Sequence, residues 1–156
     1  MLALDHLTLT HVKLHGALYN VAAKERAIAD AVSRAVASFD RRLFLFAPAG
    51  SALVMSGRSA GLTVVQEAFA DRAYRSDGTL VPRSESGALL QTERHVLRRL
   101  REILNGYVTS IDGQHIALQP DSLCIHADTP HAVEFVHLAR AEIESAGVGI
   151  AKPRAR

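Results

Sequence analysis

Short apolar, β-branched stretches alternate with helical patterns along this chain of 156 residues, and this alternation limits the folds open to it. The strand-like stretches cover residues 7–12, 43–47, 62–65 and 122–125. The helical patterns cover residues 21–39, 51–58, 91–104 and 130–146. Such alternation predicts a largely parallel sheet, either open or closed into a barrel. Four strands with their helices amount to about half of an eight-stranded β/α barrel.

Two connecting segments have a predicted structure of their own. Residues 69–86 contain an Asp-Gly pair and a proline, which favour an ordered loop over a helix or a strand. Residues 107–111 and 114–118 flank a second Asp-Gly pair, which is typical of the two-residue turn of a β-hairpin.

The helical patterns also predict which side chains face the core. The recurring apolar residues of the helix over 21–39 are Ile28, Val32, Val36 and Phe39. Those of the last helix are Phe135, Val136, Ala139 and Ile143, with Thr129 as the predicted N-cap and Pro130 as the first helical residue. The basic residues of the helix over 91–104 are Arg94, Arg98, Arg99 and Arg101. They lie largely opposite its apolar stripe and predict a solvated face rather than a nucleic-acid patch.

The composition excludes several classes of protein. The 18 basic and 16 acidic residues give a formal net charge of +2, which argues against nucleic acid as a partner. No run of about 18 apolar residues is present, so no membrane span is predicted. The single cysteine, Cys124, suits a reducing cytoplasm, and its apolar neighbours favour a core position over a nucleophilic role. We expect a soluble, cytoplasmic protein with one domain over residues 1–151 and a frayed basic tail over 152–156.

Ionisable side chains follow three of the four predicted strands. They are Lys13 and His15 after the first strand, Glu67, Asp71 and Arg72 after the third, and His126 and Asp128 after the fourth. Ligands of α/β proteins bind at the carboxyl ends of parallel strands. We therefore predict that these residues lie on one face of the sheet and form a site there.

Each of these residues also has a structural interpretation. Lys13 could be a solvated strand end, and His15 and Asn20 could orient the turn after the strand through backbone hydrogen bonds. Asp71 could pair with the arginine beside it and brace the long loop. Asp128 could be an anion favoured by the start of a helix.

The same residues raise the question of a metal or a nucleotide site. Two histidines and several carboxylates meet the minimum for a hydrolytic metal site. None of them has a local spacing such as His-x-x-x-His, so we assign none of them to a metal. The phosphate-binding pattern Gly-x-x-x-x-Gly-Lys-Ser/Thr is absent, so the sequence predicts no nucleotide site of this chain's own.

Four segments resemble the motifs of one known family. Residues 12–20 read VKLHGALYN, similar to VKPHGALYN, and residues 67–74 read EAFADRAY, similar to E-x-FADRxY. Residues 77–83 read DGTLVPR, and residues 124–132 read CIHADTPHA, similar to CVHGDTPHA. In this order the segments resemble the LamB/YcsF family, the 5-oxoprolinase A subunits, over nearly the whole chain.

The chain departs from the family pattern at three places. Leu14 stands where the family usually has proline, and we expect this to loosen the turn that aims His15. Ala127 stands where the family usually has glycine, which requires that this position not need a positive φ. Family members also begin with a portion, carrying DLNxDxGE and NxACGxHAGD motifs, that this chain lacks. We therefore expect the chain to correspond to the carboxyl-terminal majority of a family domain.

The resemblance implies an α/β fold, namely an incomplete, distorted (β/α) barrel related to glycoside hydrolases and deacetylases. It also implies ATP-dependent hydrolysis of 5-oxoproline to glutamate, with ATP as co-substrate and subunits B and C as partners. For this chemistry, proton handling is assigned to His15, Asp71, His126 and Asp128. Contacts to substrate and phosphate are assigned to Lys13, Asn20, Glu67 and Arg72. A bound metal and a homo-oligomer are left open.

Two other functions are left open. A stand-alone metal-dependent amide or acetyl hydrolase would hold its metal at His15, His126 and Asp128. A non-catalytic remnant would only bind partners or a ligand. If the first barrel strands are absent, the side chains left at an exposed seam are Leu2, Leu4, Leu7 and Leu9. We then expect the isolated chain to be poorly stable or to self-associate, and to be inactive.

Overall fold

The computed structural model describes residues 8–154, which form two compact units. The first unit comprises the described residues up to Gln66 and the short segment from Pro153, and the second comprises Glu67–Lys152. Whether residues 1–151 act as one domain stays a prediction. Three leucines of the expected seam, at positions 2, 4 and 7, lie outside the described residues, and Leu9 is 43% exposed.

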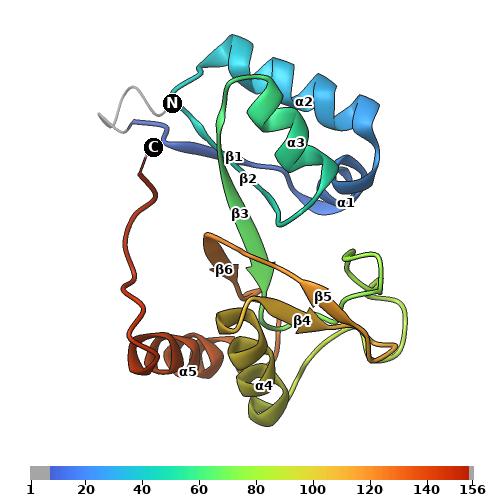
Figure 1. The fold of residues 1–156 in the computed structure, drawn as a ribbon, viewed down its shortest axis with the longest axis vertical. Coiled ribbons are helices and arrows are strands. Elements are labelled where there is room, and N and C mark those ends of the chain that lie inside the picture. The colour runs from blue at the N-terminus through green and yellow to red at the C-terminus, as the bar shows by residue number, and fades with distance from the viewer. Residues whose placement is uncertain (1–7, 155–156) are drawn as a thin grey trace. The chain divides into compact units, whose positions relative to one another are not determined.

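The first unit begins with alternating strands and helices (Figure 1). Its elements are β1 (His11–Lys13), α1 (Gly16–Lys24), α2 (Arg26–Phe39), β2 (Phe44–Pro48), α3 (Ala52–Ser59) and the first part of β3 (Thr63–Phe69). Strands β1 and β2 pair in parallel, with Lys13 opposite Phe46. The three helices pack on one another, and α1 and α3 also pack on β2.

The core of the first unit is built largely from small and branched apolar side chains. Its buried members are Ala22, Ala29, Val36, Ala37, Leu43, Leu45, Ala47, Leu53, Val54 and Leu62. Helix α3 approaches the strands closely at Gly57, where an added Cβ would lie 2.7 Å from Val64 Cγ2 and 2.9 Å from Leu45 Cδ2. Glycine is needed there because the strand side chains fill the space that a larger residue would take.

The second unit combines the end of β3 with a further strand, two helices and a hairpin (Figure 1). Its other elements are α4 (Glu93–Leu104), β4 (Tyr107–Thr109), β5 (His115–Ala117), β6 (Ser122–Cys124) and α5 (Ala132–Ser145). Strands β3 and β6 pair in parallel, with Phe69 opposite Cys124. Helices α4 and α5 pack on each other. The buried core between them and the end of β3 comprises Ala70, Val96, Leu100, Phe135 and Ala139.

The strand order confirms an α/β fold with a parallel sheet. The hydrogen-bonded order is β1-β2-β3-β6, and β4 and β5 form a separate antiparallel pair. The hairpin is confirmed, but its connection has three residues, 111–113, rather than the predicted two. The Ser110 N–H donates to the Gln114 carbonyl at 2.8 Å, and Gly113 closes the turn at φ +82°. A barrel is not confirmed, because β1 and β6 end the strand order among the described residues. In the described part of the chain, none of the helices combines the length and the apolarity that a membrane-spanning helix needs.

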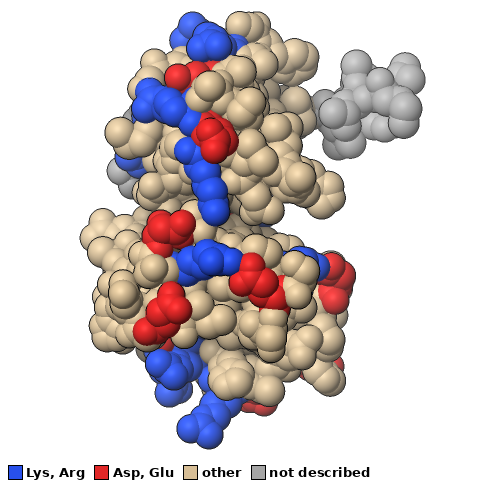
Figure 2. All heavy atoms as spheres, turned by 90° about the vertical axis from the view of Figure 1, so that its right-hand side faces the viewer, with Lys and Arg blue, Asp and Glu red and all other residues tan. Residues whose placement is uncertain are grey.

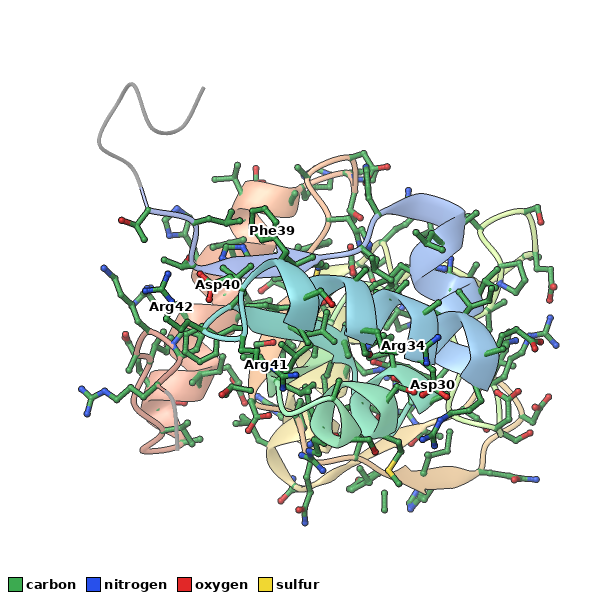
Figure 3. The ribbon with its side chains drawn as sticks, turned by 90° about the horizontal axis from the view of Figure 1, so that it is seen from above. Asp30, Arg34, Phe39, Asp40, Arg41 and Arg42 are labelled. Carbon is green, nitrogen blue, oxygen red and sulfur yellow. The ribbon has the colours of Figure 1, made fainter. Side chains whose placement is uncertain are left out.

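Several predicted helix features are wrong. The pattern over 21–39 forms two helices because Glu25 is extended, at φ −87° and ψ 104°. Phe39, the last residue of α2, is 76% exposed rather than buried (Figure 3), and Val136 of α5 is 52% exposed. Helix α5 has His131 as its N-cap, so Thr129 does not cap it. Arg99 belongs to the interior, at 6% exposed, and not to a solvated face.

Candidate active site

The second unit holds a buried carboxylate that is hydrogen-bonded to a histidine. Asp71 follows β3 and is 0% exposed. It accepts hydrogen bonds from the backbone N–H of His126 at 2.9 Å and from Thr129 Oγ1 at 2.7 Å. The Nδ1 atom of His126 lies 3.0 Å from Asp71 Oδ2. The two residues meet because the parallel strands β3 and β6 end at the same edge.

The hydrogen bonds decide the charge of Asp71. Burial by itself would raise the pKa of Asp71, but hydrogen bonds from the His126 ring, from Thr129 and from the His126 backbone outweigh it. The pKa of Asp71 therefore lies below its ordinary value, and the carboxylate is ionised at neutral pH. An ionised carboxylate only accepts hydrogen bonds, so the proton of a neutral His126 is held on Nδ1. Nε2 then carries the free lone pair that a general base needs.

The His126 ring is held but not enclosed. It stacks on Phe69, with ring centroids 5.6 Å apart and an interplanar angle of 16°. Its side chain is 26% exposed, and no hydrogen-bond partner for Nε2 is found within residues 8–154. This arrangement fits a base that water or a small ligand can reach.

Asp128 lies in the turn after His126 and is ion-paired. Arg83 NH1 donates to Asp128 Oδ2 at 2.5 Å, and Arg83 NH2 lies 3.3 Å from Oδ1. The hydrogen bond from Arg83 lowers the pKa of Asp128, and the positive charge of the same guanidinium adds to this effect. The partner of Asp128 is thus an arginine of the long loop rather than a helix end. Ala127 has no positive φ, as its substitution for glycine requires.

Arg72 anchors the long loop. It is 6% exposed and donates from NH2 to the carbonyl oxygen of Val81 at 2.6 Å, while its Nε has no partner among the described residues. An ion pair between Arg72 and Asp71, the structural alternative for these two residues, is not found among the described residues. Two backbone hydrogen bonds also hold this region to the segment after β3. The Val81 N–H donates to the Ala73 carbonyl at 3.0 Å, and the Leu90 N–H, just after the loop, donates to the Asp71 carbonyl at 2.9 Å. Residues 69–86 thus form an ordered loop, as predicted.

The remaining candidate residues are less closely connected to this pair. Glu67 is a buried residue of β3 in the second unit. Lys13 Nζ lies 5.7 Å from the ring centroid of Tyr19 in the first unit. His15 and Asn20 are exposed, and neither forms a described side-chain hydrogen bond that would orient the turn. That the residues of the first unit share a face with Asp71 and His126 stays a prediction.

Thr129 and Arg83 are site residues that the sequence does not single out. Thr129 resembles a helix cap by its position before a proline, which conceals its contact with Asp71. Arg83 lies in the DGTLVPR segment, and that resemblance is the available signal. Among residues 8–154, no group of three or more His, Cys, Asp or Glu side chains is placed to hold a metal ion.

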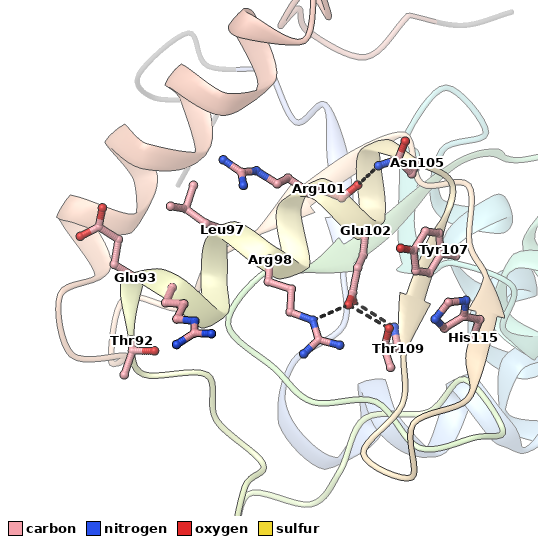
Figure 4. A pocket seen from close by; sticks show the side chains of 11 residues that line it. Thr92, Glu93, Leu97, Arg98, Arg101, Glu102, Asn105, Tyr107, Thr109 and His115 are labelled. Carbon is pink, nitrogen blue, oxygen red and sulfur yellow. Dashed lines mark hydrogen bonds and ion pairs between the residues drawn. The ribbon is translucent and has the colours of Figure 1, made fainter.

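A hollow of about 760 Å³ lies elsewhere in the second unit, over α4 and the hairpin (Figure 4). Its cations are largely neutralised, since Arg98 pairs with Glu102 at 3.1 Å and Arg101 pairs with Glu142 at 2.7 Å. Neither Asp71 nor His126 lines it. Basic and acidic side chains are also interspersed on the face that Figure 2 shows. We place the candidate active site at Asp71 and His126 because general-base chemistry needs that pair and not a wide hollow.

The chain is similar to proteins of one family along its length. The LamB/YcsF family matches residues 1–156. The 5-oxoprolinase A subunit of Symbiobacterium thermophilum is 48% identical over 152 residues, which are 97% of this chain and 58% of that protein. The 5-oxoprolinase A subunit of Halalkalibacterium halodurans is 43% identical over 150 residues, 96% of this chain and 58% of that protein.

A solved structure is also similar to nearly the whole chain. The crystal structure of a lactam utilization protein from Thermus thermophilus has a TM-score of 0.81 and 41% sequence identity. It covers 96% of this chain, and the chain covers 60% of it. The chain thus spans about three fifths of the length of the relatives it matches.

Proposed function

The chain belongs to the LamB/YcsF family, and from this premise we propose that it is part of the A subunit of a 5-oxoprolinase, which opens 5-oxoproline to glutamate. The names of the relatives, A subunits of 5-oxoprolinase and a lactam utilization protein, support a hydrolase that acts on a cyclic amide. The observation that carries the proposal is the ionised, buried Asp71 on Nδ1 of a partly exposed His126.

The proposed chemistry begins with activation of an unreactive amide. The amide oxygen of 5-oxoproline is phosphorylated by ATP, which leaves ADP. Water adds to the ring carbon, the C–N bond breaks, and the nitrogen becomes the amino group of glutamate. A second water then releases phosphate from the new side-chain carboxyl group.

His126 and Asp71 have separate roles in this scheme. His126 Nε2 takes the proton of the attacking water, as a general base. Asp71 is a positioning residue, because its carboxylate fixes the tautomer of His126 and stabilises the imidazolium that forms. Lys13, Asn20, Glu67 and Arg72 remain proposed contacts to substrate and phosphate, and His15 and Asp128 remain proposed for proton handling. Subunits B and C are proposed partners, and a closed, distorted barrel is proposed for the full length of the family.

The test is glutamate formation by a version extended to the full length of the relatives and combined with B and C subunits. Released glutamate is measured with 5-oxoproline and ATP, and again with ATP or one of the two partners left out. We expect glutamate only in the complete mixture. No glutamate in the complete mixture would contradict the proposal, and ATP-independent release would contradict its coupled form.

A further inference from the structure

The turn that carries His126 is held at three points. Its first residue donates its backbone N–H to Asp71 at 2.9 Å, and its last residue, Thr129, donates its hydroxyl to Asp71 at 2.7 Å. Between them, the Asp128 carboxylate accepts hydrogen bonds from both terminal nitrogens of Arg83, at 2.5 Å and 3.3 Å. The guanidinium of Arg83 therefore lies against the same turn as the proposed base.

The backbone that carries Arg83 is anchored, and its side chain is partly exposed. Arg72 holds the carbonyl of Val81, two residues before Arg83, and Val81 is 1% exposed. The loop also closes on itself just after this point, where Glu85 N–H donates to the Pro82 carbonyl at 2.9 Å. The Arg83 side chain is 43% exposed. Arg83 thus extends from an anchored position into solvent beside the turn.

The two carboxylates beside His126 differ in how readily they could release their partners. Asp71 is 0% exposed, and loss of its hydrogen bonds would leave a buried, unpaired charge. The side chain of Asp128 is 65% exposed, and an exposed ion pair is worth little because water solvates both ions. Arg83 can therefore exchange Asp128 for another carboxylate at small cost. Its planar guanidinium matches a carboxylate with two parallel hydrogen bonds.

We propose that Arg83 forms a carboxylate-binding subsite, in which it exchanges Asp128 for the carboxylate of the lactam substrate. The subsite rests on the proposed function, since 5-oxoproline joins a lactam ring to a single carboxylate. Asp128 is then an internal anion that holds Arg83 in place while the subsite is empty and competes with the substrate for it.

The experiment compares two ligands that differ only in this carboxylate. Binding of 5-oxoproline and of 2-pyrrolidinone, the same ring without the carboxylate, is measured by calorimetry on the version extended to the full length of the relatives. Arg83→Ala is expected to weaken 5-oxoproline binding about 10-fold or more and to leave 2-pyrrolidinone binding unchanged. Asp128→Asn removes the competing charge and is expected to tighten 5-oxoproline binding by about 2- to 5-fold.

Arg75→Ala is the matched control. Arg75 belongs to the same loop and forms an exposed ion pair with Glu85, at 2.5 Å, so its removal tests loop order without touching Asp128. It should leave binding of both ligands unchanged. Equal losses for both ligands in Arg83→Ala, or the same loss in Arg75→Ala, would overturn the subsite while leaving the proposed function intact.

Two further results distinguish a failure of the subsite from a failure of the proposed function. Arg83→Lys keeps the charge without the planar fork and should retain part of the preference for 5-oxoproline, even if the alanine variant unfolds. Unchanged 5-oxoproline binding in Arg83→Lys and in Asp128→Asn would overturn the subsite alone. A wild-type extended version that binds neither lactam would contradict the proposed function and the subsite with it.

Discussion

The carboxylate of Asp71 lies 3.0 Å from Nδ1 of His126, although 55 positions separate them in the sequence. The contact exists because β3 and β6 are parallel neighbours, so the residues that follow them meet at one edge of the sheet. It gives the histidine one defined tautomer and leaves Nε2 for chemistry.

We predict that Asp71→Asn changes this tautomer. The amide can turn its oxygen toward Thr129 and the His126 backbone, and its NH₂ group then faces Nδ1 and favours an unprotonated Nδ1. Nitrogen NMR of the neutral imidazole should show the proton on Nδ1 in the wild type and on Nε2 in the variant. The same tautomer in both proteins would contradict the role given to Asp71.

The lowered pKa of Asp71 predicts a pH-dependent stability. Because the folded-state pKa lies below the ordinary value of 3.8, the ionised carboxylate stabilises the fold at neutral pH. This contribution is lost as the pH falls through 3.8 toward the lower folded-state pKa. Asp71→Asn should therefore lower the unfolding free energy by about 1–3 kcal/mol at pH 7, with a smaller difference at pH 3.

Urea unfolding at the two pH values measures this difference. Asp112→Asn is the control, since Asn-Gly forms the same hairpin turn as Asp-Gly and the residue is exposed. It should change the unfolding free energy little at either pH. A difference for Asp71→Asn that is equal at both pH values would be inconsistent with the pKa argument.

Arg99 and Arg98 form a matched pair for the interior of the second unit. Both pair with Glu102, but the Arg99 side chain is 7% exposed and the Arg98 side chain is 70% exposed. Arg99 also donates to the Thr109 carbonyl at 2.9 Å and lies 5.2 Å from the ring centroid of Tyr74. We expect Arg99→Ala to cost about 3 kcal/mol and Arg98→Ala about 0.5 kcal/mol. Similar unfolding free energies for the two variants would show that the buried contacts add nothing.

Gly57→Ala tests the packing of the first unit. The new methyl group would meet Val64 and Leu45 at under 3 Å, and this strain should exceed the gain in helix propensity. We expect a net loss of about 1 kcal/mol or more in thermal or urea unfolding. Gly149→Ala, whose new Cβ would meet no described atom within 4 Å, should be nearly neutral. A Gly57→Ala variant as stable as the wild type would mean that the strands can move to accommodate the methyl.

Features set by local chemistry could be predicted from the sequence. The hairpin around Asp112-Gly113 is one, because an Asp-Gly pair between two short apolar stretches favours a tight turn, although the connection is one residue longer than predicted. The parallel sheet is another, because the alternation of strands and helices leaves few other arrangements. Asp71 and His126 are both candidates from the sequence because each follows a predicted strand.

Features set by distant partners could not be predicted in this way. Thr129 has the local pattern of a helix cap, but its hydroxyl donates to a carboxylate 58 positions away. Arg99 has the local pattern of a solvated face, but Tyr74 and Thr109 cover it. The pairing of Asp71 with His126 depends on strand order, which the residue pattern does not contain.

The role of His126 is tested most directly by the rate of glutamate release. In the complete reaction, with ATP, both partner subunits and the full-length version, His126→Gln should lower the rate about 10²-fold or more, because Nε2 no longer accepts the proton of water. His137→Gln, an exposed change on α5, is the control and should leave the rate unchanged. A rate for His126→Gln within about twofold of the wild type would contradict the account, since the proposed base would then be dispensable.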